Sequence, residues 1–194
     1  MDDVLVVDDG MPVAAARRLN ESAREVGAAV HRLARNGGKG YAVAAGLELL
    51  LARRPAPASV LVLDADGQHP SAAIPKFLAA GAEADLVIGD RLADRGGMPP
   101  ARRLANRLAS LLLGLTTGRP VPDSQCGMRL LRGRALGEVA FPQGGYEAET
   151  RHLKACLRAG VRVAWVPIPA VYDGAASSFR PVRDSLRVLW AVVS

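Results

Sequence analysis

The sequence is poor in aromatic residues, in cysteine and in long uncharged apolar runs. Phe, Trp and Tyr make up 4% of the 194 residues, which argues against the stacked aromatic platforms of single-stranded nucleic-acid binders. Two cysteines cannot form the disulfide framework of a small secreted protein, so we expect a reducing, cytoplasmic compartment. Acidic residues directly after Met1 argue against a signal peptide. The most apolar stretch, 104–115, carries Arg107 and is too short to cross a membrane.

What the sequence has in excess is arginine. Apolar residues make up 49% and charged residues 23%, which is enough for a buried core and argues against disorder. The 25 basic residues outnumber the 19 acidic ones, and only three of the 25 are lysine. Guanidinium groups bind phosphate in a bidentate manner, so this excess favours phosphate or anionic lipid partners. An arginine-rich chain is also what a gene of biased base composition encodes.

Short apolar runs typical of buried strands alternate with helical periodicities along the chain. This alternation predicts a single α/β domain over 1–194 with a mostly parallel sheet. Ligands of such sheets bind at the carboxyl ends of the strands, where the polar clusters of this chain fall. The predicted strands are 4–7, 28–33, 59–63, 85–89, 125–131 and 161–166, and the predicted helices are 13–26, 41–53, 71–81, 100–115 and 146–159.

Asp64 and Asp66 follow the third predicted strand with one small residue between them. Two carboxylates at this spacing converge on one hard divalent cation, and Gln68 can add a further oxygen ligand. Such a cation would neutralise a diphosphate leaving group as a Lewis acid. The alternative is a pair of solvated loop aspartates, with Gly67 making the turn.

Asp8 and Asp9 end the first predicted strand, and a glycine-rich loop, 35–40, follows the second. The two acids either cap a helix or accept hydrogen bonds from the NH and hydroxyl groups of a ligand. The loop offers backbone NH groups and two cations to a phosphate, although it lacks the Walker pattern and a glycine-rich turn is commonly only a turn.

Three further features carry charge or hydrogen-bonding groups. The segment 123–129 brings an acid, an amide and a cation to one strand entry. Glu147 and Glu149 begin a helix, where carboxylates ordinarily stabilise the dipole. His69 has no His or Cys cluster around it in the sequence, so we expect a structural role rather than zinc ligation.

Taken together and in order, these motifs resemble family 2 glycosyltransferases, and most closely the dolichol- and undecaprenyl-phosphate hexosyltransferases. The resemblance runs from about Val4 to the C-terminus. The motifs that carry it are VVDDG, RNGGKG, DADGQHP, GDR, DSQCGMRLL, YEAE and VPIPAVYDGAASSFR. It implies a GT-A fold, a nucleotide-sugar donor of the GDP-mannose or UDP-glucose type, Mg²⁺ or Mn²⁺, inversion at the sugar, and a polyprenyl-phosphate acceptor at the cytoplasmic membrane face. Nucleic acid is not an expected partner.

The resemblance also assigns roles to residues by their place in these motifs. It places four residues at the nucleotide sugar, namely Asp8, Asp9, Lys39 and Asp64, and three at the metal, namely Asp64, Asp66 and Gln68. It places Arg91, Arg102 and Asn106 at the acceptor phosphate, and Asp66, Asp123 and Arg180 at the reacting groups. A phosphate monoester, whose second pKa is about 6, is already an anionic nucleophile at pH 7, so Asp123 is either a base or an orienting group.

The chain departs from the family pattern in three places, one of which is that many relatives carry C-terminal transmembrane helices whereas this sequence stops at Ser194. It begins at what corresponds to the family's second strand, so the usual first strand is expected to be missing, and Met11 and Pro12 replace the polar residues that follow the paired acids. The apolar run near the end predicts an amphipathic helix over about 181–193, which either lies on an anionic membrane surface or packs on the core. Two alternative functions therefore stay open: an impaired homologue that serves as a binding subunit, and a related transferase with a soluble acceptor.

Overall fold

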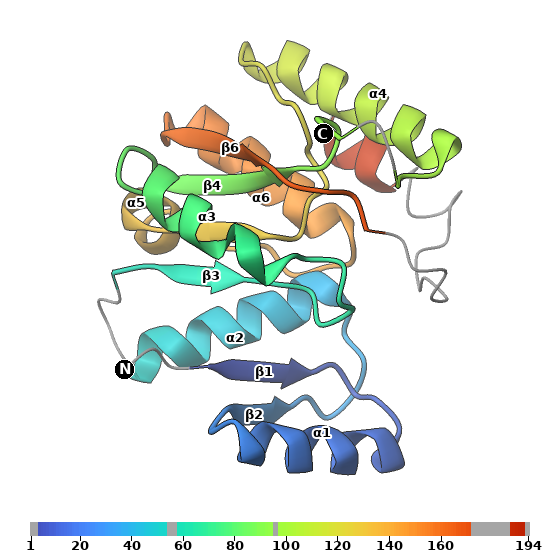
Figure 1. Ribbon diagram of the computed structural model, residues 1–194. Coiled ribbons are helices and arrows are strands. Elements are labelled where there is room, and N and C mark those ends of the chain that lie inside the picture. The colour runs from blue at the N-terminus through green and yellow to red at the C-terminus, as the bar shows by residue number, and fades with distance from the viewer. Residues whose placement is uncertain (1–3, 54–57, 95–96, 172–186, 193–194) are drawn as a thin grey trace.

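The computed structural model describes residues 4–53, 58–94, 97–171 and 187–192, which form two sheets with helices packed around them (Figure 1). The first sheet has two parallel strands, β1 (Leu5–Asp8) and β2 (Ala29–Arg32), with Leu5 opposite Ala29 and Asp8 opposite Arg32. Helix α1 (Val13–Glu25) connects them. Val4 and the β1 residues Leu5 to Val7 keep part of their surface exposed. The sequence prediction of two strands joined by a helix is confirmed here.

The second sheet has four strands in the order β3-β5-β4-β6. They are β3 (Val60–Val62), β4 (Leu86–Asp90), β5 (Arg129–Leu131) and β6 (Val163–Pro167). Strands β4 and β6 are parallel, as predicted, whereas β5 is antiparallel to both β3 and β4. The chain enters β5 at the edge where β4 ends, so β5 has to run in the opposite direction. The sheets are therefore more mixed than the predicted mostly parallel arrangement.

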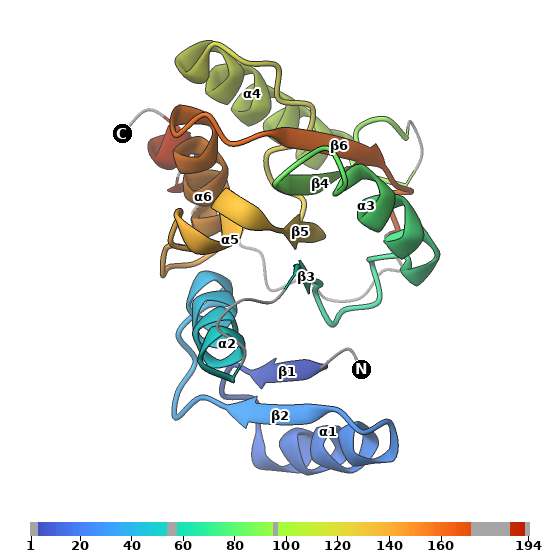
Figure 2. The same cartoon turned by 90° about the vertical axis from the view of Figure 1, so that its left-hand side faces the viewer.

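Helices cover both faces of the four-stranded sheet. Helix α3 (Ile74–Ala80), preceded by the 3-10 turn η1 (Ser71–Ala73), lies on one face, and α6 (Glu147–Arg158) lies on the other (Figure 2). Helix α2 (Lys39–Arg53) packs against both β1 and α6, so it joins the two sheets. The core side chains that are almost fully buried come from the strands of this sheet and from the helices packed on it, and they include Phe77, Leu86, Val87, Ile88, Leu113, Leu130, Leu131 and Leu153.

Three helical segments complete the described structure. Helix α4 (Pro100–Thr117) lies above the sheet, the short α5 (Gly133–Gly137) follows β5, and residues 187–192 are helical beside α4 and α6. The sequence prediction missed α5, whose five residues are too few for a periodic pattern. None of the helices that the structure describes is both long and apolar enough to span a bilayer.

Candidate active site

The predicted polar clusters come together along one edge of the four-stranded sheet. Strands β3 and β4 end there, and the loop 123–128 approaches β5 from the same side because β5 is antiparallel to both. Helices α2 and α6 also begin there, with Lys39 and Glu147 as their first residues. Side chains far apart in the sequence therefore meet at this edge, as the carboxyl ends of strands commonly allow.

Lys39 holds two of these carboxylates. Its Nζ lies 2.7 Å from Asp64 Oδ2 and 2.8 Å from Glu149 Oε1, so the start of α2 is joined to the tip of β3 and to α6. Burial alone would lower the pKa of Lys39, but the Glu149 and Asp64 charges outweigh it and raise the pKa above its usual value. Lys39 is thus a permanently charged bridge.

Gly127 makes this bridge possible. A Cβ placed on residue 127 would collide with the Asp64 carboxylate and would lie 2.6 Å from the Lys39 Nζ. The backbone of the loop 123–128 therefore passes directly over the ion pair, and a side chain at 127 would displace the Asp64 carboxylate or the Lys39 ammonium group.

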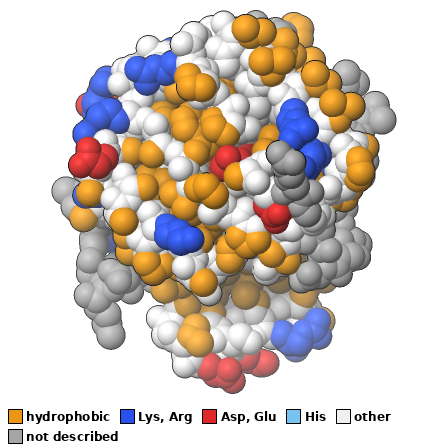
Figure 3. Space-filling model, turned by 45° about the horizontal axis from the view of Figure 1, so that its top comes forward, with side chains coloured by type: hydrophobic (Ala, Val, Ile, Leu, Met, Phe, Trp, Pro, Cys, Tyr) orange, Lys and Arg blue, Asp and Glu red, His pale blue; other side chains and the backbone are white. Residues whose placement is uncertain are grey.

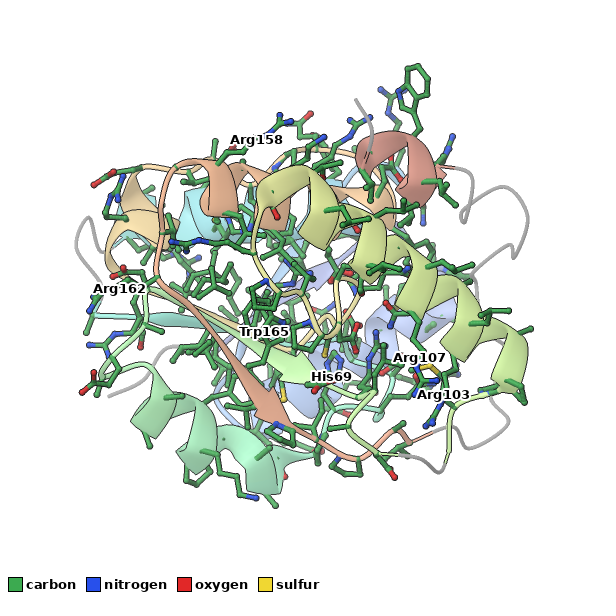
Figure 4. All side chains as sticks on the ribbon, turned by 90° about the horizontal axis from the view of Figure 1, so that it is seen from above. His69, Arg103, Arg107, Arg158, Arg162 and Trp165 are labelled. Carbon is green, nitrogen blue, oxygen red and sulfur yellow. The ribbon has the colours of Figure 1, made fainter. Side chains whose placement is uncertain are left out.

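Asp64 is also held by His69. The Asp64 N–H donates to His69 Nδ1 at 3.0 Å, while His69 Nε2 lies 3.7 Å from Asp64 Oδ2. Burial lowers the pKa of His69, which keeps the imidazole neutral and lets Nδ1 accept the hydrogen bond. His69, labelled in Figure 4, therefore orients the metal-binding candidate, in agreement with the structural role expected from the sequence.

Asp66 is more open to solvent than Asp64 and Gln68. Asp66 is exposed and its Oδ1 accepts the Gln68 N–H at 3.0 Å, which shapes the turn after β3. Among the described residues, no group of three or more His, Cys, Asp or Glu side chains surrounds a common point. Two carboxylates and an amide oxygen nevertheless fit Mg²⁺ or Mn²⁺, because Mg²⁺ is usually held by one or two carboxylates together with substrate phosphates.

Asp123 is fully buried and is held as an ion by Arg91. Arg91 Nε donates to Asp123 Oδ2 at 2.8 Å and Nη2 donates to Oδ1 at 3.0 Å, which is a bidentate pair. Asn106 Nδ2 and the Gln125 N–H donate to Oδ1 at 2.8 and 3.0 Å. Burial by itself raises the pKa of Asp123, but Arg91 and these hydrogen bonds outweigh it and lower the pKa below its usual value.

Asn106 lies beneath this pair rather than at the surface. It is buried in α4, and its Oδ1 accepts a hydrogen bond from Ser110 Oγ at 3.3 Å. Ser110 Oγ in turn accepts the Ser124 N–H at 2.9 Å. The side chains of α4 thus position Asp123 from below, and a direct contact of Asn106 with a phosphate stays a prediction.

Arg129 supports the whole edge, a role that sequence analysis did not identify. It is almost fully buried and donates to three backbone carbonyls, those of Cys126, Glu149 and Ser124, at 2.9, 2.8 and 3.1 Å. The guanidinium therefore fixes the loop 123–128 against α6. An arginine between the apolar residues 128 and 130 was the signal that could have revealed it. Glu149, expected only to stabilise the helix dipole, instead binds Lys39.

The two acids at the end of β1 bind groups of the neighbouring strand and loops. Asp8 is buried, accepts the Met11 N–H at 2.8 Å and pairs with Arg32 at 2.8 Å. Asp9 accepts the N–H groups of Gly37 and Gly38 at 2.7 and 2.9 Å, so it holds the glycine-rich loop directly before Lys39. Their predicted contacts with a nucleotide stay predictions.

Two other residues predicted from the sequence are Arg102 and Arg180. Arg102 lies in the first turns of α4, half-buried, four residues before Asn106. Arg180 lies outside the described residues. Cys126, next to Asp123, is buried, and burial raises the pKa of its thiol to about 12, which leaves it unreactive.

Comparison with known proteins places the chain among sugar-transferring enzymes. The sequence profile of glycosyl transferase family 2 matches residues 2–140. An undecaprenyl-phosphate mannosyltransferase of Micrococcus luteus is 35% identical over 178 residues, which cover 87% of this chain and 72% of that protein. An undecaprenyl-phosphate 4-deoxy-4-formamido-L-arabinose transferase of Edwardsiella ictaluri is 32% identical over 136 residues, covering 69% of this chain and 40% of that protein.

Solved structures show the same fold. Glucosyl-3-phosphoglycerate synthase from Mycobacterium tuberculosis, in complex with Mn²⁺, uridine diphosphate and phosphoglyceric acid, superposes with a TM-score of 0.70 at 22% identity, over 100% of this chain and 67% of that one. Mannosyl-3-phosphoglycerate synthase from Rubrobacter xylanophilus gives a TM-score of 0.65 at 22% identity, over 100% of this chain and 61% of that one. The predicted GT-A fold is confirmed.

Proposed function

The chain belongs to glycosyltransferase family 2, and from this membership we propose that it transfers a hexose from a nucleotide sugar to a polyprenyl phosphate, with inversion at the sugar. That it is a glycosyltransferase follows from the family. The acceptor class is supported by the relatives from Micrococcus luteus and Edwardsiella ictaluri, whose names specify undecaprenyl phosphate. The protein would then work at the cytoplasmic face of the membrane.

The state of Asp123 is the observation that carries the acceptor class. Transfer to a hydroxyl group needs a base that removes a proton, and such a base works best with a pKa near the working pH. Asp123 is instead buried, and its carboxylate accepts hydrogen bonds from Arg91, Asn106 and the Gln125 N–H. These contacts lower its pKa below the usual value. A phosphate monoester is already anionic at pH 7 and needs orientation rather than deprotonation.

We therefore assign Asp123 an orienting role: it fixes the Arg91 guanidinium at the end of β4. Arg91, Arg102 and Arg180 would supply the positive charge that receives the acceptor and the departing diphosphate, with Asn106 holding Asp123 in place. This arrangement favours an electrostatic site over general-base catalysis.

Asp64, Asp66 and Gln68 would hold Mg²⁺ or Mn²⁺. When bound, the metal would neutralise charge on the diphosphate leaving group. Lys39 keeps the Asp64 side chain ionised and oriented. Glu149 holds Lys39 in place, and His69 holds the backbone of Asp64. Asp9, through the loop directly before Lys39, and Asp8, through Met11 and Arg32, would shape the pocket for the base and ribose of the donor.

A transfer assay tests the proposal. The wild-type chain is incubated with GDP-mannose or UDP-glucose, Mn²⁺, and either undecaprenyl phosphate in detergent or 3-phosphoglycerate, and labelled product is counted. We expect transfer to the lipid, lost on chelation and reduced about 10²-fold or more by Asp66→Asn or Arg91→Met, since each removes charge stabilisation at the reacting groups. The exposed Glu138→Gln serves as the matched control.

Two results would contradict the proposal. Faster transfer to 3-phosphoglycerate than to the lipid would indicate an enzyme with a soluble acceptor. Absence of transfer, together with no binding of GDP or UDP in calorimetry with Mn²⁺, would indicate the binding-subunit alternative.

A further inference from the structure

Helix α4 carries a stripe of exposed leucines on the side opposite to its buried face. Leu104, Leu108, Leu111 and Leu115 follow one another at intervals of four, three and four residues, so they lie on one face of the helix. Their side chains are 60, 49, 60 and 72% exposed. A stripe this regular is what the core-facing side of a helix usually shows, yet here it faces solvent.

The leucine stripe is not the face by which α4 packs on the core, because the helix has a different buried face. Asn106, Ala109, Ser110 and Leu113 are the buried residues of the helix, and Asn106 reaches Asp123 at 2.8 Å. At 100° per residue the leucines lie on the far side of the helix from these four. One face of α4 therefore supports the candidate active site, while the other exposes a continuous apolar surface.

The neighbouring C-terminal segment adds further exposed apolar groups. Residues 187–192 lie beside α4 in both ribbon views, and Leu189 and Trp190 are 41 and 65% exposed. The buried Lys154 of α6 donates to the Val192 carbonyl at 2.6 Å, and Val188, Ala191 and Val192 are buried. The segment is thus held on the core, with Trp190 left outside. Figure 3, which brings this side forward, shows hydrophobic side chains gathered at its upper part.

The two described segments that form this surface carry positive charge and no carboxylate. Helix α4 contains Arg102, Arg103 and Arg107 and no carboxylate, and residues 187–192 contain Arg187 and no carboxylate. Arg103 and Arg107, labelled in Figure 4, are one turn apart and flank the leucine stripe on one side. An apolar stripe bordered by arginine is the pattern of a helix that lies in the interface of an anionic membrane.

We propose that the leucine stripe of α4 is the surface that docks this protein on an anionic lipid bilayer. The proposal deepens the proposed function, because a polyprenyl-phosphate acceptor resides in such a bilayer and α4 connects its surface to Asp123. A second copy of the chain is the less favourable occupant. A two-fold pairing of these helices would bring arginine rows together with no carboxylate on either helix to balance them.

Vesicle flotation tests this surface. The wild-type chain is mixed with vesicles of phosphatidylcholine alone, or of equal parts phosphatidylcholine and phosphatidylglycerol, and floated on a density gradient. We expect binding to the anionic vesicles, reduced about tenfold or more by the double variant Leu108→Glu/Leu111→Glu, since both changes place a charge in the apolar contact. Leu78→Glu, at a leucine of α3 that is 52% exposed, is the matched control and should float like the wild type.

A charge variant separates the two contributions. Arg107→Glu should weaken binding to the anionic vesicles about fivefold or more, and raised salt should weaken wild-type binding in the same way. Arg158→Glu, an exposed arginine of α6, is its control. Equal flotation of the double leucine variant and the wild type would overturn the proposal. A wild-type dimer that this double variant dissociates, with flotation unchanged, would identify a second copy as the occupant.

Flotation needs neither donor nor acceptor, so it is independent of catalysis. If the transfer assay fails while vesicle binding depends on the stripe, the proposed reaction falls and the docking surface stands. If transfer to the detergent-solubilised lipid succeeds while the vesicles are not bound, the docking surface falls and the proposed reaction stands.

Discussion

Strands β1 and β4 are almost the same in sequence, LVVD and LVIGD, but the structure uses them differently. Leu86, Val87 and Ile88 of β4 are fully buried, because β4 is paired on both sides and helices cover both faces of its sheet. Leu5, Val6 and Val7 of β1 are only half-buried, with β2 as the one strand paired to β1 in the described structure. The burial of a strand thus depends on its neighbours more than on its own residues.

The acids at the strand ends differ in the same way. Asp8 and Asp9, after β1, bind groups of their own unit and of the adjacent glycine-rich loop. Asp64 and Asp123, beside the four-stranded sheet, are held by Lys39 and Arg91, which lie on other elements. The acids of the two-stranded unit therefore hold nearby loops, whereas the ion pairs of the candidate site lie beside the four-stranded sheet.

The largest effect should come from matched truncations of the two strands. Leu86→Ala removes a fully buried side chain and should lower the free energy of unfolding by about 3–4 kcal/mol, because it leaves a cavity. Leu5→Ala removes a half-buried one and should lower it by about 1 kcal/mol. Urea unfolding followed by circular dichroism measures both. Equal losses would show that β1 is as deeply packed as β4.

Acid should weaken the four-stranded unit through His152. Burial, with Arg129 nearby, lowers the pKa of His152 from 6.5 to about 4. Between about pH 6.5 and 4 the His152 imidazole is protonated in the unfolded chain but neutral in the folded one. The free energy of unfolding therefore falls by about 3 kcal/mol as the pH drops through this range, and His152 does not change it at higher pH.

This pH dependence is measured as urea midpoints across the same range. His152→Gln should flatten the profile relative to the wild type, while His31→Gln in β2 is the matched control from the other unit. Identical slopes for the wild type and His152→Gln would refute the assignment.

The smallest effect should come from the loop beside the two-stranded unit. Asp9→Ala removes the acceptor for the Gly37 and Gly38 N–H groups, and we expect a loss of about 1 kcal/mol because water replaces part of it. Amide hydrogen exchange should accelerate at these two glycines and stay unchanged in β4. Glu21→Ala, exposed in α1, is the control. Unchanged exchange at Gly37 and Gly38 would show that Asp9 does not hold the loop.

The sequence was sufficient to predict what depends on short-range patterns. Apolar runs located β1, β3, β4 and β6, and helical spacing located α1, α2, α4 and α6. It did not predict the direction of β5, because strand direction depends on which edge the returning chain enters. The contact of Lys39 with Glu149 and the three carbonyl bonds of Arg129 were also missed, since they join segments far apart in the chain. The roles of Asp64, Asp66 and Asp123 stay predictions, and the structure adds that Asp64 and Asp123 lie at the same edge of the four-stranded sheet.

The close passage of Gly127 over Asp64 and Lys39 also determines how this site can vary in evolution. Any side chain at 127, even the methyl group of alanine, would push on the ion pair without altering a single charged residue. A saturation library of the site would therefore disturb the ion pair even at a position with no functional group of its own.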